Sequence, residues 1–321
     1  MLLAGDVGGT KTRLGLFERG HRRPAPVALH TYATSSYDSL TAILDAFAAA
    51  VGRSFTVDAA ALGVAGPVSG SIARLTNIHW DIAALEVTTR FETARVSLMN
   101  DLEATANSVD VLEPGELEVL QAGTPRADGN AAVIAAGTGL GQSYLQRLDE
   151  RLTPLASEGG HADFAARTDR ELELVKMLRD LYGRAEVEQV LSGPGLLNLH
   201  RFTHRGGACE MLEGADDQPA RISQAALAGR CQQCVEALRM FVSAYGAEAG
   251  NLALRGVATA GLYVGGGIAP KILPMIRSGL FMEAFLAKAP MADLVAAIPV
   301  KVILNPDAGL LGAAVRAQDI A

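Results

Sequence analysis

A strand–glycine–strand pattern occurs twice in this chain, and it restricts the possible folds more than any other feature of the sequence. The first copy is LAGDVGGTKTRLGLF near the N-terminus, and the second is AAVIAAGTGLGQSYL, which begins at residue 131. In each copy two apolar stretches flank a short turn of glycine and threonine, which predicts an antiparallel pair of strands. The copies agree in pattern rather than in letters, as a duplicated α/β domain would produce.

Further apolar segments extend both copies into alternating strands and helices. The expected strands lie at 25–33, 59–65, 96–99, 258–264 and 300–304. The expected helices lie at 38–51, 170–182, 195–203, 221–227, about 230–249, 271–279 and 308–318. This alternation predicts two α/β domains, a small one of residues 1–110 plus 302–321 and a large one of residues 111–301.

Composition narrows the class of protein. The chain has 321 residues, of which 49% are hydrophobic and 20% are charged, as in ordinary globular proteins. Its 28 basic and 35 acidic residues give a net charge of −7, which argues against a nucleic-acid binder. Asp6 interrupts the first apolar run, and no apolar stretch is long enough to span a bilayer. We therefore expect a cytoplasmic protein that binds neither nucleic acid nor membrane.

Both glycine turns have the chemistry of a phosphate site. Glycine lets backbone N–H groups approach a phosphate closely, Thr10 and Thr138 add hydroxyl donors, and Lys11 adds a positive charge. Asp6 could hold Mg²⁺ through water, because Mg²⁺ binds few protein carboxylates directly. Either turn alone would more often be a simple tight hairpin, but two such turns favour nucleotide binding. The P-loop pattern GxxxxGK[ST] is absent, and both turns lead into strands rather than into the helix of a dinucleotide fold.

Four segments, taken in order, resemble the superfamily that joins actin, hexokinase and the heat-shock ATPases. They are GDVGGTKTRLGLF, AAGTGLGQSYL, GLYVGGGIAP and NPDAGLLGAA. With TNIHW, MNDLEA, SEGGHADF and VEQVLSGPGLLNL, which together span nearly the whole chain, the sequence is similar to the bacterial glucokinases of the non-zinc type. The resemblance implies an α/β, two-domain actin-like ATPase (ribonuclease H-like) fold with a central cleft. It also implies ATP, Mg²⁺ and glucose as ligands, and a homodimer.

The resemblance also assigns the residues that bind ATP. Both glycine turns supply contacts to the phosphates. The glycines after the strand at 258–264 supply a flat surface for adenosine. The implied ATP-binding residues are Gly5, Asp6, Val7, Gly8, Gly9, Thr10, Lys11, Gly137, Thr138, Gly139, Gly265, Gly266 and Gly267. In the last helix the small residues Gly309 and Gly312 suit a close helix crossing at a hinge.

Asn100 and Asp101 follow a predicted strand end, where side chains are often displayed to a ligand. A kinase needs a group that accepts the proton of the attacking hydroxyl. From the residues alone, Asp101 could equally be the N-cap of the helix that follows. The resemblance makes Asp101 the catalytic base and a substrate ligand, and it places Asn100 on a sugar hydroxyl.

Glu158 and His161 flank two glycines, and a carboxylate and an imidazole suit the vicinal hydroxyls of a sugar. The resemblance makes both residues sugar ligands and adds Glu188, whereas Glu186 fits the spacing before LSGPG less well. A lone glutamate on a helix is more often solvated, and a glutamate–histidine set could also hold a metal. Asn77, in TNIHW, is expected near the sugar.

Cysteines are few: Cys209, Cys231 and Cys234. The spacing of Cys231 and Cys234 suits a metal, but no second Cys or His pair accompanies it in the sequence, so free helix cysteines are favoured and no zinc is expected. The cysteine-rich zinc motif of the related repressor–kinase family is absent after SEGGH.

Three functions remain open from the sequence. ATP-dependent phosphorylation of D-glucose is the first. A kinase for another hexose or an N-acyl amino sugar is the second, and an ATP-driven switch that acts on no sugar is a remote third. The sequence leaves the phosphoryl donor open as well, since ADP or polyphosphate could replace ATP.

Overall fold

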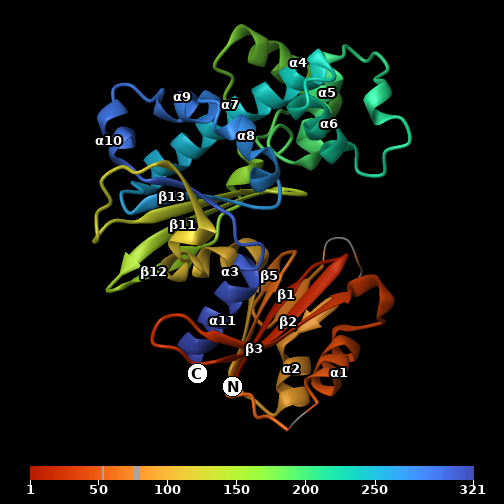
Figure 1. The fold of residues 1–321 in the computed structure, drawn as a ribbon, viewed down its shortest axis with the longest axis vertical. Coiled ribbons are helices and arrows are strands. Elements are labelled where there is room, and N and C mark those ends of the chain that lie inside the picture. The colour runs from red at the N-terminus through yellow and green to blue at the C-terminus, as the bar shows by residue number, and fades with distance from the viewer. Residues whose placement is uncertain (53, 76–77, 79) are drawn as a thin grey trace. The chain divides into compact units, whose positions relative to one another are not determined.

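The computed structural model describes residues 1–52, 54–75, 78 and 80–321 (Figure 1). The chain forms two compact units. Unit 1 comprises Met1–Pro114, Arg151–Pro154 and Asn305–Ala321, and unit 2 comprises Gly115–Glu150 and Leu155–Leu304. The strand at Val300–Ile303, of which residues 302 onward were expected in the small domain, lies in the sheet of unit 2.

Unit 1 is built on a five-stranded sheet with the order β3-β2-β1-β4-β8. The strands are β1 (Leu2–Val7), β2 (Lys11–Glu18), β3 (Ala25–Ala33), β4 (Ala59–Val64) and β8 (Val96–Asn100). As predicted, β1 and β2 are antiparallel around the first glycine turn. Strands β1, β4 and β8 are parallel, so their carboxyl ends share one edge of the sheet.

Helices cover both faces of this sheet. They are α1 (Leu40–Val51), α2 (Ala84–Phe91), α3 (Asp101–Asn107) and α11 (Ala308–Ile320). On one face the predicted apolar stripe of α1, which includes Ile43 and Phe47, packs against the sheet. On the other face α11 and α3 pack against the sheet and each other, so closely that a Cβ on Gly312 would lie 1.7 Å from the carbonyl oxygen of Ala104. A small sheet that the sequence analysis missed completes the unit: β5 (Val68–Ser69), β6 (Ile72–Arg74) and β7 (Asp81–Ala83).

Unit 2 contains the second copy of the pattern. Its sheet has the order β12-β11-β10-β13-β14-β9, although residues 151–154 of the edge strand β12 are grouped with unit 1. The first five positions repeat the arrangement of unit 1. The strands are β9 (Leu117–Gln121), β10 (Ala131–Ala136), β11 (Leu140–Leu148), β12 (Arg151–Leu155), β13 (Gly261–Gly265) and β14 (Val300–Ile303). Strands β10 and β11 are antiparallel, and β10, β13 and β14 are parallel. The weak repeat in the sequence therefore corresponds to a repeated topology.

Helices of unit 2 form one core with this sheet. They are α4 (Asp169–Tyr182), α5 (Gly193–Thr203), α6 (Gln218–Leu227), α7 (Gln232–Gly256), α8 (Leu273–Ile276), α9 (Leu280–Leu286) and α10 (Ala292–Ala297). The helix expected at 271–279 is wrong in extent, because a 3₁₀ turn occupies Ala269–Ile272 and α8 is a single short turn. Pro270 and Pro274 lack the N–H groups that a continuous helix there would need.

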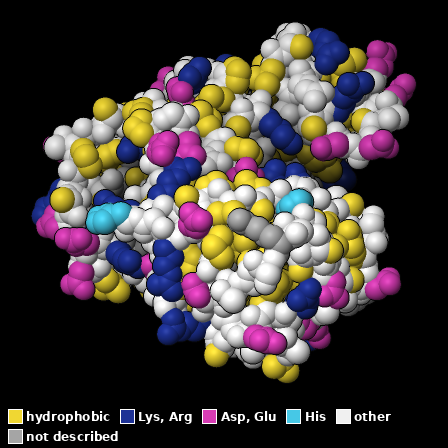
Figure 2. Space-filling model, turned by 60° about the horizontal axis from the view of Figure 1, so that its bottom comes forward, with side chains coloured by type: hydrophobic (Ala, Val, Ile, Leu, Met, Phe, Trp, Pro, Cys, Tyr) yellow, Lys and Arg dark blue, Asp and Glu magenta, His cyan; other side chains and the backbone are white. Residues whose placement is uncertain are grey.

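The surface is mixed in charge. On the face shown in Figure 2, lysine and arginine side chains lie among acidic ones, with hydrophobic groups between them. Within the described ranges, no helix combines the length and the apolar character that crossing a membrane requires.

Candidate active site

The first glycine turn joins β1 to β2 and is held from behind by a buried threonine. The N–H of Gly8 donates to the carbonyl oxygen of Lys11 at 3.0 Å, which closes the turn. The hydroxyl of Thr34, which the sequence analysis did not single out, donates to the carbonyl oxygen of Gly8 at 2.7 Å. Thr10 and Lys11 are exposed at the tip. The turn is thus fixed on its inner side, while its hydroxyl and amino groups face outward.

Two of the predicted ATP-binding residues lie deeper in unit 1. Gly5 lies within β1, where a Cβ would come within 2.3 Å of Leu62. Val7 is fully buried in the core. The structure therefore gives both residues a packing role, and a nucleotide contact at either position stays a prediction.

Asp6 and Asp101 lie at the same edge of the sheet. The strand register places Asn100, the last residue of β8, level with Val7 of β1. Burial and the nearby Asp101 carboxylate raise the pKa of Asp6, against the opposing charges of Arg13 and Lys11. No hydrogen bond reaches the Asp6 carboxylate from the residues that the structure describes. Two carboxylates near each other without a hydrogen-bonded cation suit a site that binds a cation together with an anionic ligand.

Asp101 is the first residue of α3, and the N-cap is its neighbour. The side-chain carbonyl of Asn100 accepts from the backbone N–H of Glu103 at 2.6 Å, so the N-cap reading considered for Asp101 belongs to Asn100. The NH₂ group of Asn100 then remains as a donor for a ligand. The Asp101 side chain is exposed, yet desolvation by the surrounding protein raises its pKa, against the N–H of Leu102 that donates to it at 2.9 Å.

The second glycine turn, in unit 2, joins β10 to β11 and is held by a carboxylate. The N–H of Gly137 donates to the carbonyl oxygen of Gly139 at 2.8 Å. Glu188, expected to bind the sugar, accepts from the N–H of Leu140 at 2.7 Å. Thr138 is exposed, and a Cβ on Gly137 would meet no atom within 4 Å. This turn therefore also presents an open outer surface.

Glu188 connects this turn to the loop that carries the other predicted sugar ligands. Its own N–H donates to the carbonyl oxygen of Gly160 at 2.8 Å. Gly160 in turn packs so tightly that a Cβ would lie 2.2 Å from the carbonyl oxygen of Leu140. The predicted phosphate turn of unit 2 and the Glu158–His161 loop are thus one connected structure.

His161 is surrounded by carboxylates. Its Nδ1 lies 2.9 Å from the Oε2 atom of Glu186, the residue that fitted the sequence pattern less well. This hydrogen bond raises the pKa of His161, and the charges of Glu188 and Glu158 raise it further, against partial burial. The imidazole therefore stays protonated to higher pH than usual, where both ring nitrogens donate. Glu158 and His161 are exposed.

The glycines after β13 form the third predicted ATP segment. Gly266 has φ of +83°, and a Cβ there would lie 2.3 Å from the carbonyl oxygen of Ala136. Gly267 faces open space. The buried hydroxyl of Tyr245 on α7 accepts from the N–H of Ala136 at 3.1 Å and lies 3.4 Å from the carbonyl oxygen of Gly265. A tyrosine within the mostly apolar stretch 240–247 of this helix was the available signal, since a buried hydroxyl needs a partner.

The structure brings only some of the predicted site residues together. Asn77 lies outside the described residues. Asp6, Asn100 and Asp101 belong to unit 1, whereas Glu158, His161 and Glu188 belong to unit 2. Their convergence on one sugar stays a prediction. A surface hollow of about 410 Å³ on unit 2, lined by residues such as Arg170, Glu236 and Arg239, contains none of them.

Comparison with known proteins identifies the family. A family model described as Glucokinase matches residues 3–320. A glucokinase of a Synechocystis species is 38% identical, with 98% of this chain and 97% of that protein covered, and one of Erwinia tasmaniensis is 34% identical, with 97% and 94% covered. The chain belongs to the glucokinase family. This confirms the resemblance predicted from the sequence and makes the chain a sugar kinase.

Solved structures agree with the predicted fold. The crystal structure of a glucokinase from an Antarctic psychrotroph has a TM-score of 0.89 at 30% identity, with 99% of this chain and 98% of that chain covered. A ROK family glucokinase from Streptomyces griseus, in complex with glucose and AMPPNP, has a TM-score of 0.65 at 23% identity, with 99% of each chain covered. The fold is therefore that of the two-domain actin-like sugar kinases, as expected for this glucokinase-family chain.

Proposed function

We propose that this chain transfers the γ-phosphoryl group of ATP to the 6-hydroxyl of D-glucose, with Asp101 as the base. The observation that carries this proposal is the placement of Asp101. It stands exposed at the start of α3, at the carboxyl edge of the parallel strands, beside Asp6 and with a raised pKa. A raised pKa makes a carboxylate a better proton acceptor, provided that it stays ionised at the working pH.

Asp101 takes the proton of the attacking hydroxyl as the new oxygen–phosphorus bond forms and the bond between the γ-phosphorus and its bridging oxygen breaks, which releases ADP. Its Oδ1 is oriented by the N–H of Leu102, which leaves the other oxygen for the sugar. The NH₂ group of Asn100 donates to a neighbouring sugar hydroxyl. Phosphoryl transfer depends mostly on positioning and on charge stabilisation, so this orientation matters as much as basicity.

Asp6 fits the expected magnesium site. Its carboxylate oxygens are hard ligands, and water can complete the coordination that Mg²⁺ prefers. When bound there, magnesium would supply positive charge that offsets the charge of the phosphates. Asp6 would hold the ion through water, and Lys11 adds a positive charge at the tip of the same turn.

Backbone N–H groups of both turns bind the phosphates, assisted by the hydroxyls of Thr10 and Thr138. Gly265, Gly266 and Gly267 leave room for adenosine beside the end of β13. Glu158 and Glu188 accept from sugar hydroxyls, and His161 donates to another. The two domains close on the substrates and exclude water. We further propose a cytoplasmic homodimer.

A coupled assay with ATP, Mg²⁺ and glucose tests this function. We expect ATP turnover that depends on glucose and yields glucose 6-phosphate. Failure of any sugar to stimulate turnover would favour the remote alternative, an ATP-driven switch. A panel of other hexoses and N-acyl amino sugars tests the sugar, and replacing ATP by ADP or polyphosphate tests the donor.

A further inference from the structure

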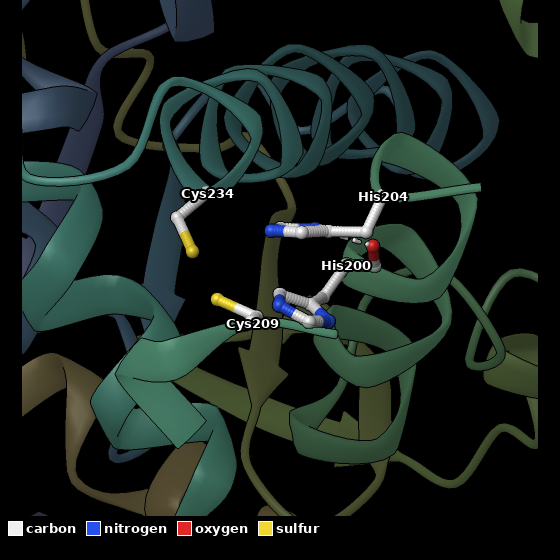
Figure 3. Close-up of side chains that lie close together, drawn as sticks. All are labelled: His200, His204, Cys209 and Cys234. Carbon is white, nitrogen blue, oxygen red and sulfur yellow. Dashed lines mark hydrogen bonds between the residues drawn. The ribbon is translucent and has the colours of Figure 1, made fainter. Parts of the chain in front are cut away.

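Two histidines and two cysteines meet in unit 2, away from the residues discussed above. His200 lies in α5, His204 ends that helix, Cys209 lies in the loop that follows, and Cys234 lies in the first turn of α7. One ligand atom from each of the four residues lies within 4.8 Å of all the others. In Figure 3 the two sulfur atoms face the edges of the two imidazole rings.

The geometry is close to that of a tetrahedral metal site. Zinc binds sulfur at about 2.3 Å and imidazole nitrogen at about 2.0–2.1 Å, so neighbouring ligands of a tetrahedron lie roughly 3.3–3.8 Å apart. Ligand atoms that already lie within 4.8 Å of one another need to approach by at most about 1–1.5 Å. Two thiolates and two imidazoles form a common structural zinc set.

Each of the two histidines has a ring nitrogen that could bind a metal ion. The Nδ1 atom of His204 lies 2.9 Å from the carbonyl oxygen of His200, so Nδ1 carries the hydrogen and Nε2 is left with its lone pair. The Nε2 atom of His200 is buried and has no hydrogen-bond partner among the described residues. A buried polar atom without a partner is costly, and a metal ion would satisfy it.

Cys231 lies at the border of this cluster and supplies a matched control. Its Sγ lies 3.4 Å from the Nε2 atom of His204, but Cys231 is not among the four residues that approach one another. It is also the N-cap of α7, where its sulfur accepts from the N–H of Cys234. Its removal would leave all four proposed ligands in place.

We propose that His200, His204, Cys209 and Cys234 bind one Zn²⁺ ion, which ties the α5–α6 loop to the start of α7. This structural site is separate from His161 and differs from the expectation of no zinc, which rested on the Cys231–Cys234 spacing and on the missing cysteine-rich motif after SEGGH. The ion would also brace the helix whose first residue, Gly193, donates to the carbonyl oxygen of Gly137 in the second glycine turn.

Metal titration of the purified full-length chain, under a reductant that does not bind metals, tests the site. After chelator treatment, Co²⁺ or Zn²⁺ alone is added back. We expect one ion per chain, with the thiolate charge-transfer and d–d absorption of tetrahedral Co²⁺. Zinc should raise the midpoint of thermal unfolding and protect two of the three thiols from alkylation.

Variants assign the ligands. Cys209→Ser and His204→Gln should weaken Zn²⁺ binding more than about 100-fold, beyond the 10- to 100-fold expected for an outer-shell partner. Cys231→Ser should still bind one tetrahedral ion, and all three variants should keep basal sugar kinase activity. Absence of tetrahedral Co²⁺ absorption in the wild type would overturn the proposal. So would a Cys209–Cys234 disulfide that forms without metal and explains the thiol protection, or loss of the ion only in Cys231→Ser.

Discussion

The two glycine turns have the same topology but different supports. In unit 1 a neutral hydroxyl, that of Thr34, holds the turn through the carbonyl oxygen of Gly8. In unit 2 a carboxylate, that of Glu188, holds the turn through the N–H of Leu140. The backbone N–H of Glu188 also donates to the carbonyl oxygen of Gly160, beside His161. The Thr34 hydroxyl, by contrast, bonds to Gly8 and Thr12 and to no described residue of a predicted sugar loop. The difference suggests that phosphate and sugar binding are coupled through unit 2.

Asp101→Asn should have the largest effect on catalysis. The substitution lies in unit 1 and changes neither Thr34 nor Glu188. We expect kcat to fall about 10²–10⁴-fold, because the amide cannot accept the proton, while glucose affinity is largely kept. Steady-state kinetics and glucose titration measure both quantities. Glu103→Gln on the same helix is the control and should leave kcat within a few-fold of wild type.

Glu188→Gln tests the coupling. A hydrogen bond to a charged acceptor is worth about 1.5–3 kcal/mol, or about 10- to 150-fold. The sequence alone predicts weaker glucose binding with little change in ATP affinity. The structure predicts that both affinities fall, because the same carboxylate holds the N–H of Leu140. Calorimetric titration with glucose and with AMPPNP separates these outcomes. Weaker binding of glucose alone would contradict the coupling of the two sites through Glu188.

Gly312→Ala tests the close crossing of α11 and α3 beneath the sheet that carries the first turn. The new methyl group would lie 1.7 Å from a backbone oxygen of α3, so we expect a loss of about 1–3 kcal/mol or more in the free energy of unfolding. Gly309→Ala is the matched control, since its Cβ would meet Asp6 at an ordinary 3.6 Å. Denaturant unfolding measures both variants, and equal stability would contradict the close helix crossing.

Thr34→Val should have the smallest effect. Valine preserves the shape of the side chain but leaves the carbonyl oxygen of Gly8 without its donor. The loss of this hydrogen bond costs about 0.5–1.5 kcal/mol. We expect KM for ATP to rise roughly two- to tenfold while KM for glucose is unchanged, and Thr34→Ser to restore the wild-type value. A matching change in KM for glucose would show that the first turn is coupled to sugar binding as well.

Local patterns in the sequence predicted both turns and their antiparallel strands. A hairpin of this kind is determined by apolar residues and glycines that lie within a few residues of one another. From the residues alone, Asp101 could be the N-cap of α3, but the structure gives that place to Asn100, whose side chain also suits a cap. It favoured Glu188 over Glu186, yet the fold gives Glu186 the hydrogen bond to His161. That contact depends on how two loops meet in space, which no local pattern records.

The cysteine–histidine cluster was missed for the same physical reason. Its four residues come from α5, the loop after it and α7, so no short motif contains them. The spacing of Cys231 and Cys234 drew attention to the correct helix start, but only Cys234 belongs to the cluster. A metal pattern assembled by tertiary packing is invisible to a search for paired spacings.

The acid limb of the pH profile tests the central claim, that Asp101 is the base. Its folded pKa lies above the ordinary 3.8, so its carboxylate is lost at a higher pH than usual as the solution is acidified. Because the pKa of Asp101 is raised by folding, its ionised form lowers the stability of the folded protein above that pKa. Asp101→Asn should therefore unfold no more easily than wild type at neutral pH.

The measurement is kcat/KM for glucose against pH, for wild type and Asp101→Asn, because this ratio reports the groups of the free enzyme. Wild type should lose activity at low pH as Asp6 and Asp101 both take up protons. The residual activity of Asp101→Asn should show a shallower acid limb, from Asp6 alone and at lower pH, since the neighbouring charge is gone. An acid limb of unchanged slope and position would contradict the assignment of Asp101 as the base.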